Sequence, residues 1–150
     1  MTKKEIHAWL LHAIEEREHS LTQTWNALNE SNQQEGKSSS GDKHETGKAM
    51  VHLELENLNK QQQEILRQKE EVLRASTLVN EKTDVVRLGS LVHTTAGVYY
   101  LATGWGKTTL NNSTIMIIGL QSPVGKAILG KKTGDIFQWG TTQGIIHSIE

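Results

Sequence analysis

The segment Glu35-Gly-Lys-Ser-Ser-Ser-Gly-Asp42 separates two long stretches of helical periodicity and decides how they are assembled. Gly36 stands where the first helix should stop, and the small polar residues after it can form a turn. Two long helices joined by such a short turn pack most simply side by side in opposite directions. The segment therefore predicts an antiparallel coiled-coil hairpin over residues 1–78, with its tip near residues 36–47.

The stretches on both sides of this segment carry the periodicity of amphipathic helices. In the first helix, apolar residues recur on one face at Ile6, Leu10, Ile14, Leu21, Trp25 and Leu28. In the second, over residues 43–76, the apolar seam consists of Val51, Leu55, Leu58, Ile65 and Val72, and the polar residues Gln62 and Lys69 interrupt it. Arms of about 30 residues give a rod on the order of 45 Å long. Because such a rod buries little apolar surface, we expect it to depend on another domain for anchorage.

Residues 85–150 have a different pattern, rich in glycine and β-branched residues. The last 70 residues contain ten of the 13 glycines. Ser122 and Pro123 predict the start of one short helix, because serine is a good N-cap and proline suits the first helical position. The candidate strands are residues 85–94, 98–103, 113–119, 135–139 and 144–149. The chain is therefore predicted to be an α+β protein, in which a helical hairpin precedes a small antiparallel sheet domain with one short helix.

Composition excludes several classes of function. The chain has 150 residues, 35% apolar content, a net charge of −1 and no cysteine. Disulfides, thiolate zinc sites and cysteine nucleophiles are therefore excluded. No apolar run approaches the roughly 18 residues of a membrane span, so we expect a cytoplasmic protein without a membrane partner. Neither the first 80 residues, with 10 Lys/Arg and 13 Asp/Glu, nor the last 70, with 6 and 4, has the basic stripe of a duplex-DNA clamp.

The hairpin tip carries two carboxylates, Asp42 and Glu45, and the sequence allows two interpretations of their role. Aspartate at the N-cap followed three residues later by glutamate is the arrangement of a capping box, which would only start the helix. The same two carboxylates can supply part of a magnesium site, since Mg²⁺ takes a few carboxylate oxygens and keeps waters or other ligands. Inserted into an active site that already holds a metal, they could help to retain a second ion. Neighbouring His44 could add a ligand or simply be exposed.

Three other groups of residues have ordinary structural explanations. Glu16 and His19 have the Glu-x-x-His spacing of di-iron bundles, but a bundle needs two such motifs. The segment from Ser122 to Asp135 lacks the glycine-rich loop of a nucleotide-binding helix. Trp105 and Trp139 could belong to the core or contact a partner, and the sequence leaves both possibilities open.

The segment "SPVGKAILGKKTGD", residues 122–135, closely resembles the signature segment of bacterial Gre-type transcript-cleavage factors. Factors of this family have an N-terminal antiparallel coiled coil followed by a globular domain similar in fold to FK506-binding proteins, so the resemblance extends over the whole chain. It implies an FKBP-like domain over residues 85–150. The family motif Gly-Asp-x-x-Glu at the tip corresponds to "GDKHE", residues 41–45, which places Asp42 and Glu45 at its two acidic positions.

The resemblance implies a cofactor of RNA polymerase that is not itself an enzyme. The globular domain would dock at the rim of the polymerase's secondary channel, and the coiled coil would reach the active centre. There Asp42 and Glu45 would share a Mg²⁺ ion with the polymerase, stimulating its cleavage of backtracked RNA. The protein alone would hold no tightly bound cofactor, would meet nucleic acid only inside the elongation complex, and would be a monomer.

Two alternatives to transcript cleavage follow from the same residues. After Glu45 the family usually continues Asn-Ala-Glu-Tyr, whereas this chain has Thr-Gly-Lys-Ala, with Lys48 at an acidic position. That departure suits a regulator that occupies the secondary channel without stimulating cleavage. The FKBP-like fold is also shared with prolyl isomerases. An isomerase needs an aromatic-lined apolar cleft, and residues 85–150 have few aromatics: Tyr99, Tyr100, Trp105, Phe137 and Trp139.

Overall fold

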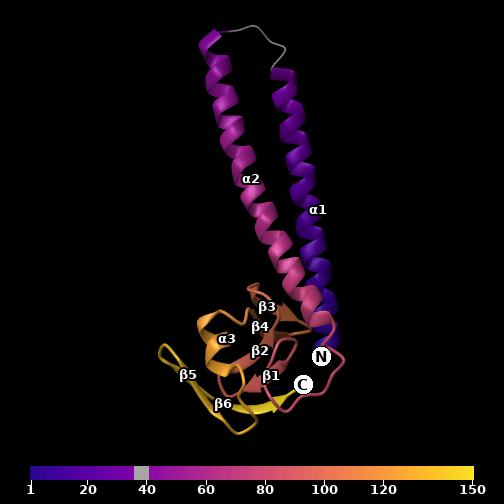
Figure 1. The fold of residues 1–150 in the computed structure, drawn as a ribbon, viewed down its shortest axis with the longest axis vertical. Helices are drawn as coiled ribbons and strands as arrows, with labels where there is room; N and C mark the ends of the chain where they lie inside the picture. Colours follow the sequence, from indigo (N-terminus) through magenta and orange to yellow (C-terminus); the bar gives the residue numbers. More distant parts are fainter. Residues whose placement is uncertain (36–40) are drawn as a thin grey trace. The chain divides into compact units, whose positions relative to one another are not determined.

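The computed structural model describes the backbone of residues 1–35 and 41–150 and the side chains of residues 1–34 and 46–150. Two long helices come first, and six strands with one short helix follow (Figure 1). The elements are α1 (Lys3–Glu35), α2 (Gly41–Ser76), β1 (Leu91–Thr94), β2 (Gly97–Leu101), β3 (Gly106–Leu110), β4 (Ser113–Ile118), α3 (Pro123–Ile128), β5 (Ile136–Trp139) and β6 (Thr142–Ile149). The predicted α+β class, with a helical hairpin before a sheet domain, is confirmed.

The chain forms two compact units. One comprises residues 12–67, and the other combines residues 1–11 with residues 68–150. Within the described residues, no helix is sufficiently long and apolar to cross a membrane.

The unit of residues 12–67 contains the larger part of both helices of the hairpin predicted over residues 1–78, and in it the two helices run side by side in opposite directions (Figure 1). Its seam buries Ile14 of α1 and Leu58 and Ile65 of α2. Gln62, the predicted polar interruption, is exposed between the last two. A small cavity of about 80 Å³ lies there, lined by Leu21, Thr22, Trp25, Leu58 and Gln62. Because the side chain of Gln62 is exposed to water and does not fill this cavity, the seam is incompletely packed beside Gln62.

The other unit contains a six-stranded sheet in the order β3-β4-β2-β1-β6-β5. Neighbouring strands are antiparallel except β2 and β4, which are parallel. The sheet is therefore mixed, although the sequence predicted an antiparallel one. The reason is β3, a strand that the sequence analysis did not find. After β2 the chain crosses to the sheet edge, forms β3 there and returns, so β4 enters beside β2 in the same direction.

The two faces of this sheet bury different partners, because successive side chains of a strand point to opposite faces. On one face, Tyr99 and Leu101 of β2 belong to a core completed by Val124 and Ile128 of α3. On the other face, Tyr100 lies fully buried and bonds to His7 of α1. The first turns of α1 are therefore part of the same unit as the sheet.

The first strand is shorter than residues 85–94, the range predicted for it. Val85 forms only an isolated bridge with Lys132, and the chain then turns at Gly89, whose φ of +80° is a conformation that other residues rarely adopt. Gly89 N–H donates to the carbonyl of Leu101 at 2.8 Å. The turn delays the start of β1 to Leu91.

Candidate functional site

The two acidic residues predicted at the hairpin tip fall in the first two turns of α2, which begins at Gly41. The residues before Gly41 lie outside the described part of the chain, so the capping-box interpretation of Asp42 stays a prediction. Asp42 and Glu45 remain three residues apart, which puts them on neighbouring positions of one helix face. Their side chains, and that of His44, lie outside the described residues. Their predicted role as a site stays a prediction.

The residue types at this helix start fit the chemistry of magnesium. Carboxylate oxygens are the ligands that Mg²⁺ prefers, and two of them leave most of its six positions to water or to another molecule. Carboxylates in a first helical turn are also stabilised by the helix dipole. Elsewhere in the part of the chain whose side chains are described, no group of three histidine or acidic residues could hold a metal ion. His19 and Glu16 therefore form no such cluster.

The segment of residues 122–135 has a well-defined local geometry. Ser122 caps α3 as predicted: its Oγ accepts from Gly125 N–H at 3.0 Å and donates to the carbonyl of Gly119 at 2.7 Å. Gly125 has no room for a side chain, since a Cβ atom would lie 2.2 Å from the Gly119 oxygen. After the helix, Asp135 closes the turn by accepting from Lys132 N–H at 2.8 Å. These residues fix the shape of the loop and explain its sequence without a bound nucleotide.

Exposed apolar side chains gather on the strands that follow this segment. Ile136 of β5 stands directly opposite Ile145 of β6 in the antiparallel register. These side chains are 56% and 42% exposed, respectively. Apolar cross-strand neighbours that face water are available for contact with a partner. Among the described residues of 85–150, Ile136 and Ile145 are the best candidates for an apolar contact with a partner protein.

The tryptophans left open by the sequence are packing residues. Trp105 stands edge-on to Trp9 of α1, with ring centroids 6.2 Å apart. Trp139 is partly buried against the core. The remaining aromatics of this domain are also internal, because Tyr99, Tyr100 and Phe137 are each less than 5% exposed. None of these three is free to line the open cleft that a prolyl isomerase would need.

A buried polar network, which the sequence analysis did not predict, ties α1 and α2 to the sheet. His7 Nδ1 lies 2.8 Å from the Tyr100 hydroxyl, and His7 Nε2 lies 2.7 Å from Ser76 Oγ. Because Ser76 Oγ donates to the carbonyl of Val72, it accepts from His7 Nε2–H, which leaves Nδ1 to accept from Tyr100. Burial lowers the pKa of His7 and raises that of Tyr100. Both groups are therefore neutral, as the bonding pattern requires.

A second set of contacts joins α2 to the loop between β2 and β3. The amide of Gln68 donates to the carbonyl of Gly104 at 3.0 Å, and the hydroxyl of buried Thr103 donates to the carboxylate of Glu71. Both sets of contacts join residues more than 30 positions apart in the sequence, so no local pattern reveals the partners.

Comparisons with known proteins identify the C-terminal part of the chain. Residues 81–150 match a family model described as "Transcription elongation factor, GreA/GreB, C-term". The C-terminal domain belongs to the GreA/GreB family. The predicted Gre-type relationship is therefore confirmed for residues 81–150.

The GreA/GreB domain and the helices before it also resemble solved structures. One is the GreA factor homolog 1 (Gfh1) protein of Thermus thermophilus, with 20% identity, 97% of this chain and 93% of that chain covered, and a TM-score of 0.37. Another is Gfh1 of Thermus aquaticus, with 20% identity, 99% and 96% covered, and a TM-score of 0.37. No curated protein sequence matches the chain.

Proposed function

We propose that this Gre-type factor binds RNA polymerase through the polymerase's secondary channel and stimulates its cleavage of backtracked RNA. One observation carries the proposal: a GreA/GreB C-terminal domain follows a helical hairpin whose second helix has Asp42 and Glu45 in its opening turn. A domain of this family supports polymerase as the partner. The acidic residues at the turn support a contribution to phosphodiester chemistry.

The hairpin supplies the reach that this function needs. In the unit of residues 12–67, each arm contains more than 20 helical residues, which corresponds to more than about 30 Å of helix. The hairpin is narrow, because only two helices pack side by side in it. A narrow rod with polar outer faces can enter a channel lined by another protein.

At the end of that rod, Asp42 and Glu45 would supply carboxylate oxygens to the polymerase's reaction centre. A shared Mg²⁺ ion supplies charge neutralisation at the phosphate when it is bound. The two side chains would hold and orient groups on one side of the scissile phosphate. Their spacing of three residues along a helix would present both carboxylates to the same site.

The GreA/GreB domain would provide the docking contact through the exposed pair of Ile136 and Ile145. Apolar side chains at the centre of an interface contribute most of its binding energy. We expect Ile136→Ser with Ile145→Ser to weaken binding to the polymerase about tenfold or more. Leu129→Ser is the matched control, because Leu129 is similarly exposed but lies after α3. Equal losses for both variants would rule out a localised docking contact at β5 and β6.

The test of the cleavage proposal is shortening of labelled RNA in a backtracked elongation complex. Wild-type protein should shorten the RNA from its 3′ end, and Asp42→Asn with Glu45→Gln should abolish shortening while binding to the polymerase is kept. Retained shortening in that variant would refute the role of the acidic pair.

The alternative function is a secondary-channel regulator that does not stimulate cleavage. It is favoured by Lys48, an exposed lysine about two turns into α2, where the family usually has an acidic residue. This alternative predicts polymerase binding with no RNA shortening by the wild-type protein. Competition with an authentic cleavage factor for the polymerase would then be the measurable activity.

A further inference from the structure

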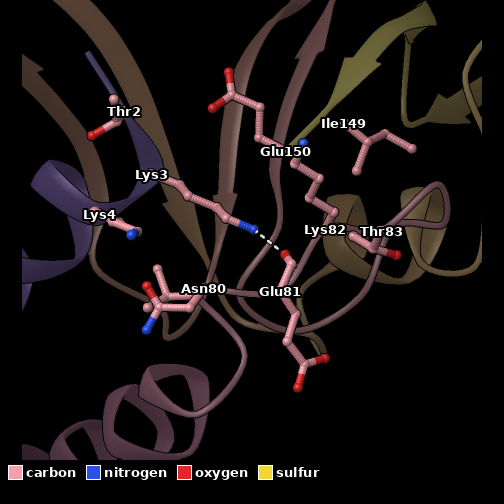
Figure 2. Close-up of a pocket in the computed structure, with 10 residues that line it drawn as sticks. Thr2, Lys3, Lys4, Asn80, Glu81, Lys82, Thr83, Ile149 and Glu150 are labelled. Carbon is pink, nitrogen blue, oxygen red and sulfur yellow. Dashed lines mark hydrogen bonds between the residues drawn. The ribbon is translucent and has the colours of Figure 1, made fainter.

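A cavity unrelated to the acidic pair lies in the unit that contains the sheet. It has a volume of about 590 Å³ and three walls: the first residues of α1, the segment of residues 79–83 and the end of β6 (Figure 2). All three walls belong to one compact unit. This volume lies within the range of sites that bind small molecules.

Backbone hydrogen bonds fix the walls of this cavity. Glu150 and Leu91 exchange two bonds, of 2.9 and 3.0 Å, which holds the end of β6 against β1. On the second wall, Val79 and Glu81 N–H groups donate to the carbonyls of Ala75 and Leu78. On the third, Thr2 and Glu5 cap the start of α1 with reciprocal bonds. The cavity is therefore formed before any ligand arrives.

The lining of this cavity has more positively than negatively charged side chains. Lys3, Lys4 and Lys82 face it, together with two carboxylates. The carboxylate of Glu81 is already paired with Arg87 at 2.7 Å. The Glu150 carboxylate, whose Oε1 also lies 3.6 Å from His93 Nε2, is then the remaining acidic side chain of the lining beside three lysines. The ammonium of Lys3 reaches across the cavity and donates to the main-chain oxygen of Glu81 at 2.6 Å (Figure 2), so two of its three N–H groups are unused in that bond. Burial lowers the pKa of Lys3, a cost that a bound anion would offset.

We infer that this cavity binds a small organic phosphate. A phosphate group carries −1.5 to −2 charges near pH 7 and three acceptor oxygens, which matches the excess of lysine ammonium groups over unpaired carboxylates in the lining. A monocarboxylate would leave that excess largely uncompensated. The side chains of Val79 and Ile149 add an apolar part to the wall, against which the organic portion of the ligand lies. The inference does not depend on the function of Asp42 and Glu45.

Titration of the ¹⁵N-labelled full chain with adenosine diphosphate tests the inference by NMR. We expect saturable amide shifts confined to residues 2–4, 79–83 and 149–150, with binding complete below about 10 mM ligand. Inorganic pyrophosphate, titrated in parallel, should bind the same residues more weakly because it lacks an organic portion. Equal affinity for both would contradict the role given to the apolar wall.

Two double variants with the same change in net charge separate a site from diffuse attraction. Lys3→Gln with Lys82→Gln should weaken binding about tenfold or more. Lys107→Gln with Lys126→Gln, both exposed and outside the cavity, should bind as the wild type does. Unchanged amide positions elsewhere in the spectrum establish that each variant is folded. The inference is overturned by an absence of saturable shifts, or by equal weakening in the two double variants.

Discussion

Substitution of Tyr100 by phenylalanine probes the contact that ties α1 to the sheet. The Tyr100 hydroxyl donates to His7 Nδ1 at 2.8 Å, and both side chains are buried. Tyr100→Phe removes this bond and leaves the ring nitrogen of His7 without a donor in a place that water does not reach. Leaving a buried acceptor unsatisfied costs about 1–3 kcal/mol. For a chain of this size, each kcal/mol lowers Tm by about 2–4 °C.

Tyr99→Phe is the matched control for this substitution. Tyr99 is buried on the opposite face, where its ring stands edge-on to Phe137, and no described residue forms a hydrogen bond with its hydroxyl. Thermal unfolding followed by circular dichroism should therefore show a Tm about 2–12 °C below wild type for Tyr100→Phe. Tyr99→Phe should change Tm much less. If the two variants have the same Tm, the His7 contact does not anchor α1 as described.

Three further predictions concern stability. Burial holds the pKa of His7 below its usual 6.5, so this imidazole takes up a proton at a higher pH in the unfolded state than in the folded state. The free energy of unfolding should therefore fall as pH drops below about 6.5. Denaturant titrations at several pH values should show a smaller fall for His7→Gln than for wild type. Gly125→Ala should destabilise the sheet domain by more than about 2 kcal/mol, because the new Cβ atom would lie 2.2 Å from the Gly119 oxygen. Gly104→Ala is the control: a Cβ atom there meets no atom within 4 Å, so the same denaturant titrations should show almost no change. Gln62→Leu should fill the cavity of about 80 Å³ in the seam and raise the free energy of unfolding of the hairpin by about 1 kcal/mol; an unchanged or lower value, measured by helical ellipticity in urea, would contradict underpacking there.

The helical hairpin could be predicted from the sequence because its physics is local and periodic. Leu58, Ile65 and Val72 recur every seven residues, and all three are buried. Gln62 breaks the same seam, and a cavity lies beside it. Gly36 and the serines after it predict a turn between the helices, and this prediction falls on residues 36–40, which lie outside the described part of the chain.

The sheet was less predictable because strand order depends on contacts between distant residues. The missed strand β3 reads Gly-Lys-Thr-Thr-Leu, and its side chains are at most half-buried. It therefore lacks the apolar alternation that revealed the other strands. Without β3, the parallel pairing of β2 with β4 could not be inferred. The sequence also gave no sign that Gly89 makes a turn before β1.

Some features of the candidate site could be predicted from the sequence and others could not. The family motif and the signature segment could be recognised in the sequence, because short stretches of chain carry them. The network of His7, Ser76 and Tyr100 could not, because it joins residues up to 93 positions apart. The cavity at the start of α1 likewise combines three distant segments. Such sites follow from the tertiary fold and not from any local pattern.

The most direct test of the proposed function uses a stalled, backtracked elongation complex supplied with magnesium and the purified protein. The length of 3′-labelled and 5′-labelled RNA is followed for wild type and for Asp42→Asn with Glu45→Gln. The proposal predicts shortening from the 3′ end by wild type alone, with equal polymerase binding by both proteins. Shortening that persists in the variant, or wild-type protein that binds the polymerase and leaves the RNA intact, would contradict it.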